Sequence, residues 1–312
     1  MVRPPQSEGS QLVRNFVQLL LEFGLLWDVE VDTFTTTTIY PYNEQVTFHN
    51  IIATQDRNKP RLLTLACHYD SKRFPEGFIG ATDSAVPCAI ILHVALALDK
   101  LLKQQEDTDI SLQVVMFDGE VNIYLSQVGK IADFHAVNVH QETLYNNTMF
   151  GPDGLYGSKS LAARWSEASF TSGPGPWCQA GEANLMDRID LLLLLDLVGA
   201  PHPRFPSYLD STTLECDHFA QELSRLEDVL VGASVSEEKF FTEECITENH
   251  NMDDHTPFIE NGLRRALHVI SDPFPEVWHT VEDNLENLDY DAVLRVNRII
   301  RVFVAQYLNL GL

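Results

Sequence analysis

The 312-residue sequence has little positive charge. It holds 21 lysine and arginine residues against 45 aspartate and glutamate residues, which gives a formal net charge of −24 at pH 7. A field of this sign repels phosphate backbones and anionic lipid headgroups, so we expect no nucleic-acid partner and no membrane partner. The same field can attract cationic peptides, and it also keeps a protein in solution.

The sequence also lacks a recognisable leader, a long hydrophobic run and paired cysteine motifs. Residues 1–10 have neither the basic region nor the apolar stretch of a signal peptide, and no apolar run reaches the roughly 18 residues that span a bilayer. The five cysteines include no Cys-X-X-Cys pair, so a zinc site built on that motif is not expected. Hydrophobic residues make up 45% of the chain, which is enough for a sizeable core, and we expect a single domain over residues 1–312.

Hydrophobic periodicity predicts alternating strands and helices. The strand–helix–strand pattern between residues 61 and 117 favours a parallel pairing, because such crossovers join parallel neighbours. We therefore predict an α/β fold with a mixed, mostly parallel central sheet between helices. The expected strands are 29–38, 45–54, 61–67, 111–117, 191–198 and 265–270, and the expected helices are 11–23, 85–102 and 291–308.

Acidic and histidine residues follow the predicted strands at the points where those strands end. Ligands in open α/β sheets bind beyond the carboxyl ends of the strands, so we expect these side chains to converge there. Oxygen and nitrogen ligands without thiolate suit a catalytic Zn²⁺ that keeps one position open. The residues are His68, Asp70, Asp83, Asp118, Glu120, Asp196, Asp253, Asp254 and His279.

Each of these residues also has a structural interpretation. Asp83 could cap the following helix, Asp118 could belong to a turn with Gly119, and Asp196 could accept from a loop amide. His279 follows Trp278 in an apolar stretch, where packing is a common role for histidine. His68 is either a metal ligand or a hydrogen-bond donor to one, and His255 and His268 are interpreted as structural.

Several sequence blocks closely resemble the animal glutaminyl-peptide cyclotransferases. The resemblance extends over residues 13–308 and is carried by Cys-His-Tyr-Asp-Ser-Lys at 67–72, Phe-Asp-Gly-Glu at 117–120 and Pro-Glu-Val-Trp-His at 275–279. Further matching blocks are 80–88, 155–158, 196–201 and 253–258. The family belongs to the zinc aminopeptidase superfamily, so the resemblance implies its three-layer fold and one zinc ion per chain.

The resemblance also implies roles for individual residues. Asp83 and His279 match two of the three zinc ligands of the family, and Glu120 matches its general acid and base. The matches for the supporting acidic residues are Asp196 and Asp253, and the walls of the substrate pocket are Phe274 and Trp278. The implied reaction converts the amino-terminal glutamine of peptides and proteins to pyroglutamate and releases ammonia.

The chain departs from the family pattern directly after Glu120. The family has a second glutamate there, its third zinc ligand, followed by a short loop with a tryptophan, whereas this chain continues with Val121 and an atypical insert at about 121–150. Val121 and Asn122 can be encoded as GTA-AAT, which has the form of a splice donor, so one hypothesis is a retained intron or an incorrect gene model. A second hypothesis is a genuine loop that folds back to supply a ligand from Asp133, His135 or Glu142, and a third is a true variant with weakened metal binding.

Cys67 and Cys88 match the cysteines that form a disulfide in secreted members of the family. The resemblance thus implies the secretory pathway, with a start that lacks the leader. Two other functions remain open at this stage: a zinc aminopeptidase with two metal ions, which would use His68, Asp83 and Asp196 as additional ligands, and an inactive homologue that binds peptide amino termini. We expect a monomer, because the sequence has no coiled-coil heptads.

Overall fold

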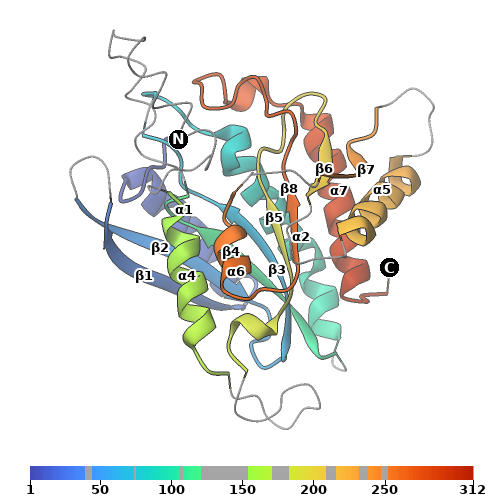
Figure 1. The fold of residues 1–312 in the computed structure, drawn as a ribbon, viewed down its shortest axis with the longest axis horizontal. Coiled ribbons are helices and arrows are strands. Elements are labelled where there is room, and N and C mark those ends of the chain that lie inside the picture. The colour runs from blue at the N-terminus through green and yellow to red at the C-terminus, as the bar shows by residue number, and fades with distance from the viewer. Residues whose placement is uncertain are drawn as a thin grey trace.

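A computed structural model of the chain describes residues 1–38, 44–73, 75–105, 108–120, 154–170, 183–208, 216–231, 238–246 and 252–311. Helices cover both faces of one six-stranded sheet, and a two-stranded sheet lies beside it (Figure 1). The helices are α1 (Glu8–Gln18), η1 (Leu19–Gly24), η2 (Ala81–Ala85), α2 (Val86–Gln104), α4 (Tyr156–Glu167), η4 (Met186–Arg188), α5 (Cys216–Val231), α6 (Thr256–Glu260), η5 (Leu285–Asn287) and α7 (Tyr290–Tyr307). The strands are β1 (Asp28–Thr37), β2 (Gln45–Thr54), β3 (Arg61–His68), β4 (Ile110–Phe117), β5 (Ile189–Leu195), β6 (Phe205–Tyr208), β7 (Phe241–Ile246) and β8 (Ala266–Val269).

The main sheet has the order β1-β2-β4-β3-β5-β8. The pairs β1–β2 and β2–β4 are antiparallel, whereas β4, β3, β5 and β8 run parallel to one another. In the register, His68 lies opposite Phe117 and Leu195 lies opposite Val269, so the parallel strands end at the same edge of the sheet. The prediction of a mixed, mostly parallel sheet between helices is confirmed.

Successive side chains of the central strands point to opposite faces of the sheet, so the hydrophobic core has two parts, one on each face. On β5, Leu191, Leu193 and Leu195 face one side, while Leu192 and Leu194 face the other. Helices α1, α2, α5 and α7 pack on the first side, and α4 and α6 pack on the second. Strands buried on both faces read as continuous apolar runs, which is the pattern of residues 191–195.

Most predicted elements match the structure to within two residues at each end, and two differ by more. The expected helix 11–23 is α-helical only as far as Gln18 and continues as the π-helix η1. The expected strand 191–198 ends at Leu195, because Leu197 has a left-handed backbone with φ of 49°, which a strand does not accommodate. The predicted insert at 121–150 lies outside the described residues.

One described segment, Ala81–Gln104, is long and apolar enough to meet the composition and length of a membrane-spanning helix. Half of its most apolar window is buried inside the protein, against the sheet and α7. A helix of the protein core passes the same test.

Candidate active site and metal centre

The candidate site lies at the carboxyl edge of the parallel strands. His68 is the last residue of β3, Glu120 follows β4, and Asp196 follows β5. Asp83 lies in η2 before α2, and His279 lies in the segment between β8 and η5. A single pocket is lined by Asp83, Glu120, Asp196, Leu197, Met252, Asp253, His268, Ile270, Phe274, Trp278 and His279. The structure thus brings together seven residues that the resemblance implied for catalysis, metal binding and the pocket: Asp83, Glu120, Asp196, Asp253, Phe274, Trp278 and His279.

Asp83 lies between two histidines. Its Oδ1 is 3.1 Å from His68 Nε2, and its Oδ2 is 3.3 Å from His279 Nε2. Although burial raises the pKa of Asp83, hydrogen bonding to His279 and His68 lowers that pKa below its ordinary value, so the carboxylate stays ionised. The backbone here is held by Asp283, which accepts from the amides of Thr82 at 2.7 Å and Asp83 at 3.3 Å.

His68 is surrounded by carboxylates. Its Nε2 lies 3.6 Å from Glu120 Oε2 and 3.6 Å from Asp196 Oδ1, and its Nδ1 lies 3.5 Å from Asp70 Oδ1. Burial lowers the pKa of His68, but the negative charge of Glu120 and hydrogen bonds to Asp196, Asp70 and Asp83 raise it well above the ordinary value. The His68 ring is thus within ion-pair distance of four carboxylates, those of Asp70, Asp83, Glu120 and Asp196.

The donor set fits a metal ion. One ligand atom from each of His68, Asp83 and Glu120 can be chosen so that all lie within 4.8 Å of one another. Two ligands held at about 2.0–2.1 Å from Zn²⁺ in a tetrahedral arrangement lie about 3.3 Å apart. The separation of His68 from Asp83 Oδ1 and that of His279 from Asp83 Oδ2 each agree with this value. Among the described residues, the His68 ring nitrogens and Asp83 Oδ2 contact their neighbours at 3.1–3.6 Å outside strict hydrogen-bond geometry, as expected for side chains that converge on a cation.

Glu120 is a buried carboxyl group at the base of the pocket. Burial raises its pKa well above the ordinary value; His68 opposes this shift, and the neighbouring Asp253, Asp83 and Asp254 add to it. Its amide donates to Asp70 Oδ1 at 3.3 Å, which fixes the backbone directly after β4. A carboxyl group in such surroundings can both accept and return a proton near neutral pH.

Asp196 is held from two sides. Ser84 Oγ donates to its Oδ1 at 2.9 Å, and the amide of Leu197 donates to the same oxygen at 2.8 Å. Burial raises the pKa of Asp196 to about 6; a hydrogen bond with His68 opposes this, and the charge of Asp253 adds to it. The left-handed conformation of Leu197 allows the chain to turn immediately after the carboxylate.

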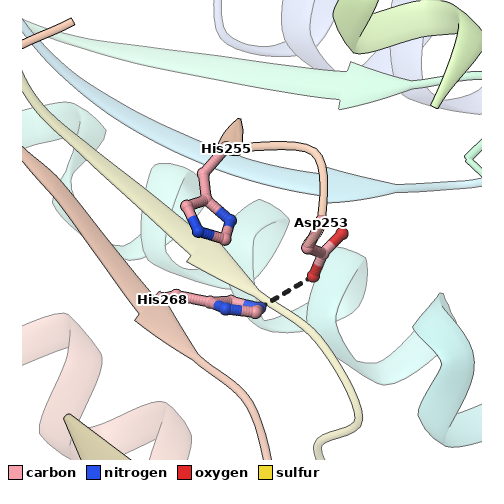
Figure 2. Close-up of side chains that lie close together, drawn as sticks. All are labelled: Asp253, His255 and His268. Carbon is pink, nitrogen blue, oxygen red and sulfur yellow. Dashed lines mark ion pairs between the residues drawn. The ribbon is translucent and has the colours of Figure 1, made fainter. Parts of the chain in front are cut away.

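Asp253 is paired with a histidine that the sequence analysis interpreted as structural. His268 Nε2 lies 2.7 Å from Asp253 Oδ2, and the His255 ring lies 4.4 Å from the His268 ring between centroids (Figure 2). This ion pair opposes the effect of burial and lowers the pKa of Asp253. The 2.7 Å separation is shorter than the roughly 3.3 Å between two zinc ligands, and Asp253 and His268 form an ion pair.

Aromatic residues form one wall of the pocket. The Trp278 ring stacks on His279 with centroids 3.7 Å apart, and Phe274 meets Trp278 edge to face at 4.9 Å. His279 has a left-handed backbone with φ of 60°, which is strained for a residue with a side chain. Its Nδ1 lies 2.5 Å from Lys72 Nζ, a contact that sequence reasoning missed although Lys72 belongs to a matching block. Burial lowers the pKa of Lys72 to about 8.

Cys67 and Cys88 form a disulfide, as the resemblance implied. The bond joins the end of β3 to the first turn of α2. His68 is the last residue of β3, and Asp83 lies shortly before α2 in the sequence. The candidates for a third zinc ligand at Asp133, His135 and Glu142, and Val121 itself, lie outside the described residues.

Comparisons with known proteins show the family of the chain. The model of peptidase family M28 matches residues 50–304. Glutaminyl-peptide cyclotransferase from Bos taurus is 40% identical, over 99% of this chain and 79% of its own length. Glutaminyl-peptide cyclotransferase from Drosophila melanogaster is 34% identical, over 98% and 77%. The crystal structure of Macrostomum lignano glutaminyl cyclase superposes with a TM-score of 0.78 at 30% identity, over 99% of this chain and 86% of that one.

A fold of this topology with acidic and histidine residues at the carboxyl edge defines a member of peptidase family M28. Within it, the chain belongs to the glutaminyl-peptide cyclotransferase family.

Proposed function

We propose that the chain catalyses the cyclisation of amino-terminal glutamine in peptides and proteins to pyroglutamate, with release of ammonia. The observation that carries this proposal is Glu120, a buried proton-accepting carboxyl group that shares one pocket with Asp196, Asp253 and an aromatic wall. The two relatives named glutaminyl-peptide cyclotransferase, whose similarity extends over 98–99% of this chain, support the same reaction.

The residues of the pocket have different roles in the proposed reaction. The α-amine of the substrate attacks its own γ-carboxamide carbon, which forms the ring C–N bond and breaks the bond to the departing nitrogen. Glu120 takes a proton from the attacking amine and delivers it to the leaving ammonia. Asp196 holds the amine close to the carbonyl carbon. The ring closure is faster because the two reacting groups are already oriented toward each other. Phe274 and Trp278 exclude water, which would otherwise compete as a nucleophile.

We propose one Zn²⁺ per chain, held by Asp83 and His279, and when bound it supplies a Lewis acid that polarises the γ-carbonyl. We propose His68 as the third ligand, because its Nε2 lies 3.1 Å from Asp83 Oδ1. The glutamate that is the third ligand in the family is replaced by Val121 in this chain. This choice leaves Glu120 unligated and available for proton transfer. The negative charge of Asp253 helps to raise the pKa of Glu120, and His268 keeps Asp253 ionised.

A second candidate function is peptide hydrolysis by an aminopeptidase. The cluster of His68, Asp83 and Glu120 favours it, because Asp83 presents one oxygen to each of two positions and could bridge two ions. The metal content separates the two functions: one zinc per chain supports cyclisation, and two support hydrolysis.

The test is ammonia release from a peptide that begins with glutamine, followed by the loss of one ammonia from the peptide mass, with and without Zn²⁺. The same peptide beginning with asparagine is the matched control, since its side chain cannot close a five-membered ring. Release of free glutamine instead of ammonia would support the aminopeptidase. If zinc binds and neither product forms, the chain is a homologue that binds amino termini without turnover.

We also propose an oxidising compartment, such as the secretory pathway, as the site of action. The disulfide between Cys67 and Cys88 supports this assignment, because reducing compartments keep thiols free.

A further inference from the structure

Arg3 is a charged side chain buried far from the surface, with 7% of its area exposed. Its Nε donates to the carbonyl of Tyr69 at 2.8 Å. One terminal nitrogen, Nη1, donates to the carbonyl of Ile79 at 2.7 Å, and the other, Nη2, donates to Gly80 at 3.2 Å. The guanidinium thus binds two stretches of backbone that are separated by about ten residues of chain.

Both stretches lead directly to candidate metal ligands. Tyr69 follows His68, and Gly80 lies three residues before Asp83. The main chain of Arg3 adds two more bonds, since its amide donates to Ser71 Oγ at 2.7 Å and its carbonyl accepts from the amide of Ser71 at 3.1 Å. Arg3 therefore ties together the two ends of the segment that connects β3 to η2.

The charge of Arg3 also suits this place. Burial lowers the pKa of its guanidinium, but the charges of Asp70, Asp83 and Asp283 oppose that shift, and an arginine remains protonated in such surroundings. The positive charge of Arg3 near Asp70, Asp83 and Asp283 reduces the electrostatic repulsion among these three carboxylates.

We propose that Arg3 is a positioning residue for the metal site, because it sets the distance between His68 and Asp83. This inference rests on the proposed function, in which Asp83 is a metal ligand. A lysine cannot replace it, because three carbonyls in different directions match the rigid fork of a guanidinium and not a single ammonium group.

The test compares the Zn²⁺ affinity of the full chain with that of Arg3→Lys and Arg3→Met, using competition with a chromogenic chelator. Groups that orient metal ligands contribute about 10- to 100-fold to metal affinity, so we expect both variants to bind zinc at least about tenfold more weakly. Hydrogen exchange of the Ser71 and Thr82 amides provides a second readout and should accelerate in both variants.

Arg295→Met is the matched control. Arg295 is also largely buried, pairs with Glu227 at 2.7 Å and lies over the Phe240 ring at 4.0 Å, away from the segment between β3 and η2. This variant should lose thermal stability and retain zinc affinity.

Unchanged zinc affinity in the Arg3 variants, an equal loss of affinity in Arg295→Met, or absence of zinc binding by the unmodified chain would each overturn the proposal. Zinc binding that depends on Arg3 in a chain that forms no pyroglutamate would instead refute the proposed function and leave the role of Arg3 in place.

Discussion

Burial gives the acidic residues of the site different properties from those of exposed carboxylates. Asp83 is held ionised by two histidines, whereas Glu120 lies among other carboxylates and its pKa is raised well above the ordinary value. The two residues are thus suited to different tasks, with Asp83 as a ligand and Glu120 as a proton carrier.

This division of tasks predicts the effect of Glu120→Gln. The amide keeps the size of the side chain but cannot accept the proton, so the rate of cyclisation should fall by about 10²- to 10⁴-fold. Zinc affinity should remain unchanged, because Glu120 is not among the ligands that we propose. Steady-state kinetics and a chelator competition measure the two effects. Loss of zinc affinity in Glu120→Gln would show instead that Glu120 binds the ion, and the exposed Glu286→Gln should alter neither quantity.

Individual elements support the site by covalent and packing constraints. The disulfide between Cys67 and Cys88 closes a loop with a sequence separation of 21 residues, and that loop includes Asp83. A cross-link of this kind restricts the unfolded chain, so it stabilises the fold without contacting substrate.

Replacing both cysteines, as in Cys67→Ala with Cys88→Ala, should lower the free energy of unfolding by about 3 kcal/mol. Urea denaturation followed by circular dichroism measures the change. Reduction of the unmodified chain should shift its urea midpoint in the same direction. A midpoint that is insensitive to both treatments would mean that the bond contributes nothing to stability.

The first helical segment presents apolar residues on two sides. Val17 and Leu21 are buried against the core, while Leu12, Phe16, Leu19, Phe23 and Leu26 are 48–76% exposed. These five make up nearly half of the exposed large apolar residues in the described part of the chain, although the segment spans only 15 positions.

Substitutions on the two sides should therefore have opposite consequences. Leu21→Ala should cost about 2–5 kcal/mol of unfolding free energy, because it leaves a cavity in the core. Phe16→Ser, on the exposed side, should change this free energy by no more than about 0.5 kcal/mol. Thermal and urea unfolding measure both variants. A large loss in Phe16→Ser would show that another surface covers this side in solution.

At the scale of the whole molecule, the net charge of −24 shapes the approach of substrate. Exposed charges act over a Debye length of about 30 Å at 0.01 M salt and about 8 Å at 0.15 M. Peptides that carry lysine or arginine beyond the amino-terminal glutamine should therefore be attracted at low ionic strength.

Raising the ionic strength from about 0.01 M to about 0.15 M should lower kcat/KM for a cationic glutamine peptide by roughly tenfold. The value for an acidic peptide of equal length should rise over the same range. An equal response of the two peptides would indicate that the negative field serves solubility and has no part in recognition.

The elements of the fold could be predicted because their signals are local. The apolar run at 191–195 and the strand–helix–strand pattern between 61 and 117 depend on neighbouring residues, and both appear in the structure with bounds close to the expected ones. The end of β5 differed, since the left-handed turn at Leu197 has no strong signal in a leucine-rich stretch.

The sequence by itself determined the family, the α/β architecture and the identity of the polar residues at the strand ends, because matching blocks and short-range periodicity carry that information. Only the tertiary structure decided which of these residues touch. Lys72 and His279 are 207 positions apart, and Arg3 contacts Tyr69 and Gly80 although α1, η1 and the strands β1, β2 and β3 lie between them in the sequence. Such contacts depend on how the layers pack, and the pairing of Asp253 with His268 follows from the same packing.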